Sequence, residues 1–512
     1  MQGSPVRRTR RSELGRRPMA RRREASAGSR STPETRATCP ERRLESGVVG
    51  PEPVSHAEQQ LFSDVGVSRV ISPMLGAIAT RLQWVLSKGD AFNMNMSIRM
   101  WVVVIVLSGL GAGLRAQEPE PVEGSRGPGL VAPLDFARVR ALWVTRYDFK
   151  TRDDIARVMN EAAALGITDV IWQARGQADA FYADALEPWG EEICTKGADG
   201  LPVPPGFDPL AEAVTLAHGA GLRLHAWFNV MPLWKGKVPP KAVNHPYLAL
   251  PGLGLRDLAG HAQPLNDHYV IVNPANEDTH VYLSAVVRDI ASRYAIDGLH
   301  LDYVRFVSDT MDATKVYPGD ADTIAAFEAA TGATFSNTPQ GLLVYRGWLR
   351  ERITALVRSI KVALEFARPG TPLTAAVWRR PDLARETYLQ DAAAWLKEGT
   401  LQHAFPMIYT VKDEQFRSDL DAWLEAAPAG TISPGLGTYL HPAAQSPVQL
   451  EYALSKGVTS AAIFAYSALF ECADPNQTKT EAARNERAAR RAALAAYLAG
   501  HVVSLPDKPQ AP

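Results

Sequence analysis

One run of ten residues, Asp297-Gly-Leu-His-Leu-Asp-Tyr-Val-Arg-Phe306, holds the side chains best placed for chemistry. Its apolar pattern predicts a buried strand. Side chains alternate between the two faces of a strand, so Gly298, His300 and Asp302 share one face. A carboxylate that points into a protein interior is costly unless it is hydrogen-bonded or has a function. We therefore expect Asp302 to be catalytic and His300 to hydrogen-bond it and tune its charge. The alternative is a buried structural His–Asp pair.

Eight short apolar runs and the helical stretches between them must position these residues. Strands are predicted at 141–146, 169–174, 222–229, 296–302, 373–378, 403–409, 431–436 and 461–466. Helices are predicted at 153–165, 209–220, 278–294, 342–366 and 386–397. Eight strands, each followed by a helix, are typical of an α/β (β/α)₈ TIM barrel. The alternative is a doubly wound open sheet, but the Gly-rich phosphate turn of that fold is missing after the first strand.

The longest connections follow the second and third predicted strands, at residues 176–208 and 230–268. In a TIM barrel, the segments that follow strands lie on the face that carries the C-terminal strand ends, where active sites are built. Asp302 ends the fourth predicted strand. The sequence therefore places Asp302 and both long loops on one face of the barrel.

The run 297–306 resembles the DGIHLDYIRYP signature of glycosyl-hydrolase-like family 10, whose members are barrel enzymes of the bacterial envelope. The likeness continues in order over most of the stretch from 140 to 470, through residues 140–145, 166–182, 208–210, 225–229, 273–274, 395 and 406–409. It implies an exported glycoside hydrolase with a polysaccharide substrate, for which peptidoglycan glycan strands are one candidate. It also aligns Asp302 with a fourth-strand acid that is the nucleophile in related α-glycosidase barrels. Met407 departs from the pattern, since many members have Gln there.

A glycoside hydrolase of this kind needs a second carboxyl group, about 5 Å from the first for retention and roughly 6.5–9.5 Å for inversion. Four further acids follow predicted strand ends: Asp179, Asp309, Asp382 and Glu471. We rank Asp309 and Asp382 first because their loops flank the strand of Asp302. The alternative for each is a solvated loop acid.

Sugars offer apolar ring faces to aromatic side chains and hydroxyl groups to polar ones. The expected substrate contacts lie on or just after predicted strands: Arg175, Asp179, Trp227, Asn229, Arg305, Tyr409 and Tyr466. Two alternatives stay open. Aromatic residues on strands often belong to the core, and Arg175 can instead pair with Asp179 or another acid.

Other chemistries have weaker support. No predicted strand contains the Lys that a Schiff-base aldolase needs, and no HxH pair, GxSxG elbow or phosphate loop is present. We therefore expect no metal and no cofactor. The competing function is a non-catalytic glycan-binding barrel of the cell envelope, because a fold does not fix a function.

The overall charge balance, 55 basic against 55 acidic residues, hides an uneven distribution. Residues 1–116 carry 18 basic and 9 acidic side chains, whereas the remainder carries 37 and 46. The acidic body argues against a nucleic-acid partner. The Arg-rich stretch 1–45 can be read as a binding arm, as a tail without a role, or as sequence that is not made. Oligomeric state cannot be derived from this sequence.

Residues 94–116 have the three parts of a secretory signal peptide: a basic start, an apolar run and a small residue before a polar segment. We expect cleavage and a periplasmic or secreted protein, with an uncleaved membrane anchor as the alternative. Met94, Met96 and Met100 each offer a start, so residues 1–93 are predicted to be untranslated or a disordered leader. A linker at 117–134, the hydrolase-like domain at 135–500 and a tail at 501–512 complete the organisation. Whether Cys194 and Cys472 pair is left open.

Overall fold

The computed structural model describes residues 135–501, apart from 137–138, 198–201, 308–309 and 311–314. The expected leader, signal peptide and linker lie outside the described residues, as does Asp309. None of the helices in the described part of the chain is long and apolar enough to cross a membrane. Cys194 and Cys472 are both free thiols, so they do not form a disulfide in this structure.

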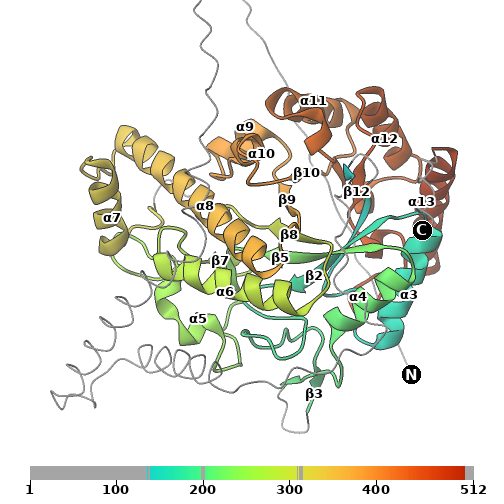
Figure 1. Ribbon diagram of the computed structural model, residues 1–512, viewed down its shortest axis with the longest axis horizontal. Coiled ribbons are helices and arrows are strands. Elements are labelled where there is room, and N and C mark those ends of the chain that lie inside the picture. Colours follow the sequence, from blue (N-terminus) through green and yellow to red (C-terminus); the bar gives the residue numbers. More distant parts are fainter. Residues whose placement is uncertain (1–134, 137–138, 198–201, 308–309, 311–314, 502–512) are drawn as a thin grey trace, which may run out of the picture. The chain divides into compact units, whose positions relative to one another are not determined.

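Eight parallel strands close into a barrel, in the order β1-β12-β11-β10-β9-β8-β5-β2 (Figure 1). All eight coincide with predicted strands, which confirms the (β/α)₈ fold. Their bounds are β1 Arg140–Val144, β2 Asp169–Arg175, β5 Arg223–Asn229, β8 Gly298–Asp302, β9 Leu373–Val377, β10 His403–Ile408, β11 Gly435–Leu436 and β12 Ala461–Ile463. Strands buried on both faces read as continuous apolar runs, and this is why the sequence revealed them.

Helices surround the barrel in the expected alternation. They are α3 Arg152–Ala164, α4 Pro209–Gly219, α6 Glu277–Arg293, α7 Ala321–Thr331, α8 Pro339–Ala367, α9 Pro381–Glu386, α10 Ala392–Lys397, α11 Asp413–Ala426, α12 Gln445–Ser455 and α13 Glu481–Gly500. Side chains fix several of their starts. Thr151 and Asp154 form a capping box on α3, and Asp208 accepts from the first free N–H groups of α4.

The prediction of one helix over 386–397 is wrong. The chain forms α9 and α10 instead, and Leu389 between them has a φ of 56°. A left-handed residue ends helical hydrogen bonding, and Asp391 then caps the start of α10.

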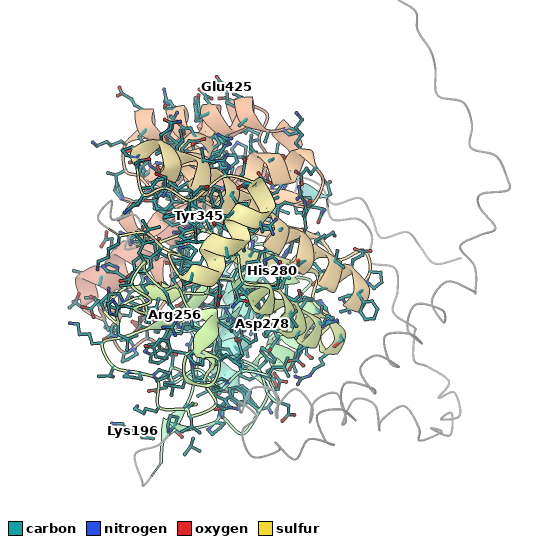
Figure 2. All side chains as sticks on the ribbon, turned by 90° about the vertical axis from the view of Figure 1, so that its left-hand side faces the viewer. Lys196, Arg256, Asp278, His280, Tyr345 and Glu425 are labelled. Carbon is teal, nitrogen blue, oxygen red and sulfur yellow. The ribbon has the colours of Figure 1, made fainter. Side chains whose placement is uncertain are left out.

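Helices α6 and α8 pack along each other on the outside of the barrel (Figures 1 and 2). His280 of α6 joins them, because its Nδ1 lies 3.1 Å from Ser359 Oγ of α8. Its Nε2 lies 2.8 Å from the carbonyl oxygen of Pro274. Tyr345, near the start of α8, donates to the carbonyl of Pro318. These contacts tie α6 to α8 and each helix to the loop segment beside it.

Two apolar cores support the barrel. The outer core lies between the strands and the helices and contains Trp172, Phe228 and Leu301. The inner core fills the barrel itself and includes Trp143, Trp227 and Phe405. Since TIM barrels are packed inside rather than open, a cleft can form only above this inner layer, at the C-terminal strand ends.

Short strands are inserted in the connections after β2 and β5. β3 Thr195–Lys196 pairs with β4 Pro202–Val203, and β6 Pro232–Lys235 pairs antiparallel with β7 Tyr269–Ile271. The second connection also holds α5 Pro246–Ala249. Through β6 and β7 it brings Lys235 and Tyr269 to the rim of the barrel.

Candidate active site

The inward face of β8 carries three residues at successive depths, as strand alternation predicts. Gly298 lies deepest, where a Cβ atom would come 2.2 Å from Nδ1 of His225, so glycine is needed to admit that ring. His300 follows in the middle of the barrel, and Asp302 lies at the top. The strand thus supports both a structural layer and an open site.

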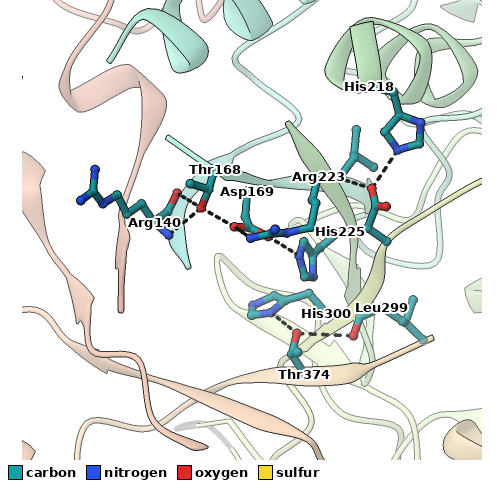
Figure 3. Close-up of polar contacts among 11 residues, drawn as sticks. Arg140, Thr168, Asp169, His218, Arg223, His225, Leu299, His300 and Thr374 are labelled. Atoms are coloured by element: carbon teal, nitrogen blue, oxygen red, sulfur yellow. Dashed lines mark hydrogen bonds and ion pairs between the residues drawn. The ribbon is translucent and has the colours of Figure 1, made fainter. Parts of the chain in front are cut away.

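His300 does not hydrogen-bond Asp302, so that part of the prediction is wrong. The indole N–H of Trp143 donates to His300 Nε2 at 3.2 Å. The other ring nitrogen, Nδ1, lies 2.9 Å from Thr374 Oγ1 (Figure 3). Burial and the neighbouring His225 and His403 hold the pKa of His300 well below its usual range. Because both ring nitrogens are occupied and the side chain is fully buried, His300 is a neutral structural residue.

Asp302 lies at the C-terminal end of β8 with 6% of its surface exposed. The backbone N–H of Tyr303 donates to its Oδ1 at 2.6 Å. Burial raises the pKa of Asp302 to about 6, although the Arg305 charge, the Tyr303 N–H and the Trp227 indole act in the opposite direction. This carboxyl group therefore changes its charge near pH 6, within the range that general acids and bases use.

Tyr303 has a φ of 50°, in the left-handed region that non-glycine residues rarely occupy. Such a backbone is unfavourable by about 1–2 kcal/mol for an L-residue. It turns the chain directly after Asp302 and lets the next N–H reach back to the carboxylate. Local strain beside an inward carboxylate is a common feature of functional sites.

A cleft of about 280 Å³ opens above the inner core, and Asp302 lies in its wall. Every strand of the barrel except β11 contributes to it, directly or through the residues just after the strand. Its lining residues are Trp143, Thr145, Arg146, Tyr147, Gln173, Trp227, Asn229, Lys235, Tyr269, Asp302, Tyr303, Arg305, Ala376, Met407, Tyr409 and Phe464. The cleft therefore combines aromatic and polar side chains around one buried carboxyl group.

Four of the predicted substrate contacts meet Asp302 in this cleft: Trp227, Asn229, Arg305 and Tyr409. The Trp227 indole N–H donates to Asn229 Oδ1 at 2.8 Å, and Asn229 Nδ2 donates to a backbone carbonyl at 2.9 Å. Asn229 thus holds the Trp227 ring in place. Tyr409 stacks on Phe464, with ring centroids 5.2 Å apart.

Arg175 does not reach the cleft, which corrects its predicted role as a substrate contact. Its Nε and Nη2 donate to Glu187 at 2.8–3.0 Å, and the side chain is fully buried. Tyr282 donates to the same carboxylate. The alternative of a structural pair holds, with Glu187 as the partner rather than Asp179. Arg175 ties the end of β2 to Glu187 in the loop that follows it.

Tyr466 and Asp382 also lie elsewhere. The Tyr466 hydroxyl donates to Glu161 of α3 at 2.5 Å, and the ring is fully buried in the outer core. Asp382 lies on the surface in α9, paired with Arg380 at 3.0 Å, and this arginine lowers its pKa. Glu471 forms an exposed ion pair with Arg484. None of the three lines the cleft.

Asp179 lies close to the cleft without lining it. It is 3% exposed, and burial together with the negative charges of Glu192 and Glu187 raises its pKa to about 7, against the attraction of Arg146. Arg146, which does line the cleft, donates from Nε to Glu192 at 2.7 Å. A pair of acids therefore flanks the arginine at the edge of the site.

Several cleft residues escaped the sequence analysis. Arg146 and Tyr147 follow β1, whereas Lys235 and Tyr269 come from the insertion after β5. Arg146 lay at the end of a predicted strand, which was a usable signal. The insertion has no periodicity that shows which side chains turn toward the barrel axis. Within the described chain, no group of three or more His, Cys, Asp or Glu residues could hold a metal ion.

The sequence profile of the family described as glycosyl hydrolase-like 10 matches residues 138–434, more than half of the chain. The chain belongs to this family. The match begins just before β1 and ends at the residue before β11, so it includes the whole signature run. The glycosyl hydrolase-like 10 assignment confirms the family indicated by that run.

Curated relatives carry glycosyl hydrolase names. The chain is 23% identical over 356 residues to glycosyl hydrolase DigH of Escherichia coli (strain K12), which covers 62% of this chain and 76% of the relative. It is 24% identical over 276 residues to glycosyl hydrolase YngK of Bacillus subtilis (strain 168), which covers 50% of this chain and 49% of the relative. The chain thus spans about half the length of the Bacillus protein.

Among solved structures, the PgaB (BpsB) glycoside hydrolase domain from Bordetella bronchiseptica is similar, with a TM-score of 0.48 and 13% identity. The superposition covers 64% of this chain and 94% of that domain.

Proposed function

We propose that this protein is an exported glycoside hydrolase that cleaves glycosidic bonds of a polysaccharide, with Asp302 as its central carboxylate. One observation carries the proposal: a buried aspartate with a pKa of about 6 ends β8 and faces an aromatic cleft at the catalytic end of the barrel. The family and the glycosyl hydrolase names of its relatives support the reaction class.

In the proposed reaction, sugar rings stack on the aromatic walls, among them Trp227 and Tyr409. Asp302, ionised above pH 6, attacks the anomeric carbon while the glycosidic C–O bond breaks. A second carboxyl group gives its proton to the leaving oxygen, and water later releases the sugar from Asp302. Asp309 stays a prediction for this acid. Glu192, which binds Arg146 of the cleft, is a candidate that only the structure suggested.

The substrate and location complete the proposal. Glycan strands of peptidoglycan are our candidate substrate, on the basis of the family resemblance. Residues 94–116 are our candidate export signal, which would deliver the protein to the periplasm or the medium. N-terminal sequencing of the native protein tests both the cleavage site and residues 1–93.

The decisive experiment compares the wild type with Asp302→Asn on purified glycans, including peptidoglycan strands stripped of peptide. Loss of the nucleophile should lower the rate by about 10³-fold or more. Asp382→Asn is the matched control, because that aspartate lies on the surface and is paired with Arg380. Equal release of fragments by wild type and Asp302→Asn would end the assignment.

A pH profile separates the two roles open to Asp302. A nucleophile must be ionised, so kcat/KM should rise about tenfold per pH unit up to about pH 6 and then level off. A general acid would give a fall above that pH instead.

A glycan-binding barrel without activity is the second candidate, since Asp302 is the single carboxylate among the described cleft-lining residues. Binding of glycan by the wild type with no release of fragments would favour it.

A further inference from the structure

The charges that line the cleft are unequal. Arg146, Lys235 and Arg305 are cationic, whereas among the described lining residues Asp302 alone is acidic. Arg146 is neutralised, because its Nε donates to Glu192 at 2.7 Å. Two cations therefore face the cleft against one carboxylate.

Lys235 and Arg305 lie at the two ends of a row of tyrosines, which we call the cationic wall. The Nζ of Lys235 lies 5.8 Å from the ring centroid of Tyr269, and this ring lies 5.0 Å from that of Tyr303. The guanidinium carbon of Arg305 lies 4.6 Å from the Tyr303 ring. The wall thus joins the insertion after β5 to the loop after β8 along one side of the cleft.

Arg305 is buried with little polar compensation. Only 7% of its surface is exposed, and its guanidinium packs between the rings of Tyr303, Trp378 and Tyr388. In the described part of the chain it makes one hydrogen bond, from Nη1 to the carbonyl of Phe306 at 3.4 Å, and its Nε has no partner. It forms no ion pair there. A buried cation in this state is unfavourable unless an anion completes its surroundings.

Lys235 differs from its neighbour Lys237 in the same insertion. Lys237 pairs with Asp267 at 2.9 Å, whereas Lys235 has no such partner within the described chain. Aromatic rings favour a nearby cation but leave its hydrogen-bond donors free. Both ends of the cationic wall thus retain charge that a ligand can use.

We propose that the cationic wall binds a carboxylate group carried by the sugar, so that the cleft selects acidic glycans over neutral ones of the same backbone. Carboxylates match the donors of arginine and lysine, and such charge-assisted bonds are about twice as strong as neutral ones. The carboxylate can come from a lactyl ether on a hexosamine or from a uronic acid. This inference deepens the proposed function and rests on it.

The test uses two acidic glycans and a neutral twin of each: peptidoglycan strands stripped of peptide and hyaluronan, both before and after chemical reduction of their carboxyl groups to alcohols. Binding is measured by calorimetry on Asp302→Asn, which separates recognition from cleavage, and kcat/KM is measured on the wild type. Lys235→Met and Arg305→Met are each compared with the control Lys237→Met.

We expect tenfold or tighter binding of one acidic glycan over its reduced twin, and a roughly tenfold loss of that preference in Lys235→Met and in Arg305→Met. Lys237→Met should keep the full preference. The glycan that shows the effect identifies the source of the carboxylate. Because Arg305 also acts on the charge of Asp302, only a loss confined to the acidic glycan supports the wall.

Equal affinity for acidic and reduced forms would overturn the inference, and so would equal losses on both forms in the two variants. Failure of the proposed function has a different signature: acidic glycan binds preferentially, yet the wild type releases no more fragments than Asp302→Asn.

Discussion

Two buried aspartates of the barrel, Asp169 on β2 and Asp302 on β8, have pKa values that are shifted in opposite directions. Asp169 begins β2 and belongs to what we call the lower layer, the buried polar residues Asp169, His225, His300 and His403 beneath the cleft. Arg223 donates to Asp169 twice at 2.7 Å, and His225 Nε2 lies 3.0 Å away (Figure 3). Despite burial, these partners lower its pKa to about 2. Asp302 lies in the upper layer, by which we mean the residues that line the cleft. Burial raises its pKa to about 6, because the Arg305 charge, the Tyr303 N–H and the Trp227 indole do not offset the loss of solvent.

Other buried polar groups of the lower layer also have partners, although Nδ1 of His225 and Nδ1 of His403 have none in the described chain. In the lower layer His300 is held by Trp143 and Thr374, and His403 Nε2 lies 2.6 Å from Ser433 Oγ. In the upper layer Arg305 keeps an Nε without a partner. Burial alone therefore does not distinguish structure from function inside this barrel. Charged partners, rather than burial, separate Asp169, which holds the fold, from Asp302, which faces the cleft.

The largest effect that tests this comparison is expected for Asp169→Asn. Removing one partner from a buried ionic cluster typically reduces stability by about 3–5 kcal/mol, because the remaining charges lose their counterion. Urea unfolding at pH 7 measures the change, while kcat/KM per folded molecule should stay within a factor of a few. A large loss of activity without a loss of stability would contradict the structural role of the lower layer.

His300→Leu should lower stability by about 3 kcal/mol. The substitution leaves the Trp143 N–H without a partner and leaves the Thr374 hydroxyl only its 3.5 Å bond to the carbonyl of Leu299. A buried unsatisfied group is unfavourable by roughly 1–3 kcal/mol. Denaturant unfolding gives the magnitude. If His300 instead acted on Asp302, the variant would keep its stability and displace the acidic limb of the pH–rate profile.

Asp302→Asn should stabilise the protein at neutral pH by about 2–3 kcal/mol, while activity is lost. The folded-state pKa of about 6 lies above the unfolded value of 3.8, so ionising Asp302 in the folded state is unfavourable. The wild type should therefore lose stability as pH rises from about 4 to about 6, with the full effect above 6.

The pH dependence of the stability gain in Asp302→Asn is the control for its cause. The stability difference between Asp302→Asn and wild type should vanish at pH 4 and below, where Asp302 is protonated in both states. The effect of Asp169 on stability has the opposite pH dependence. Its depressed pKa stabilises the fold above pH 4, and this contribution is lost as pH falls toward 2. A gain in Asp302→Asn that is independent of pH would rule out the titration as its cause.

The smallest effects are expected for Tyr409 and Tyr466, which were both predicted to contact substrate. Tyr409→Phe, in the cleft, should lower kcat/KM by about tenfold or less, the usual value of one hydrogen bond to substrate. Tyr466→Phe removes the bond to Glu161 and should lower stability by about 1 kcal/mol with unchanged kinetics. Thermal unfolding measures the stability of both variants, and steady-state rates measure their kcat/KM. A lower kcat/KM in Tyr466→Phe would place that ring in the active site.

Much of the barrel and part of its site could be predicted from the sequence. The eight strands stood out because strands buried on both faces are continuous apolar runs. Strand alternation placed Asp302 inward, and positions at strand ends placed Trp227, Asn229 and Tyr409 at the cleft. These inferences need only the neighbours of a residue along the chain.

The wrong site predictions concern side chains that bind partners which strand position alone does not reveal. Arg175 lies at a strand end like Asn229, but Glu187 and Tyr282 enclose it. Asp382 follows a strand end on a helix whose Arg380 pairs with it. Lys235 and Tyr269 line the cleft because the long insertion after β5 folds back through the β6–β7 pair. The residue pattern within the insertion does not predict that fold.

The sequence by itself thus determined the barrel, the family and the depth of Asp302, because alternation and apolar runs are local properties of a chain. Only the tertiary structure decided which buried polar groups are satisfied. That property depends on atoms brought together from strands far apart, such as Trp143 with His300 or Asp169 with His225. These partners make Asp169 and His300 structural residues, whereas Asp302 faces the cleft and is proposed to act on a glycan.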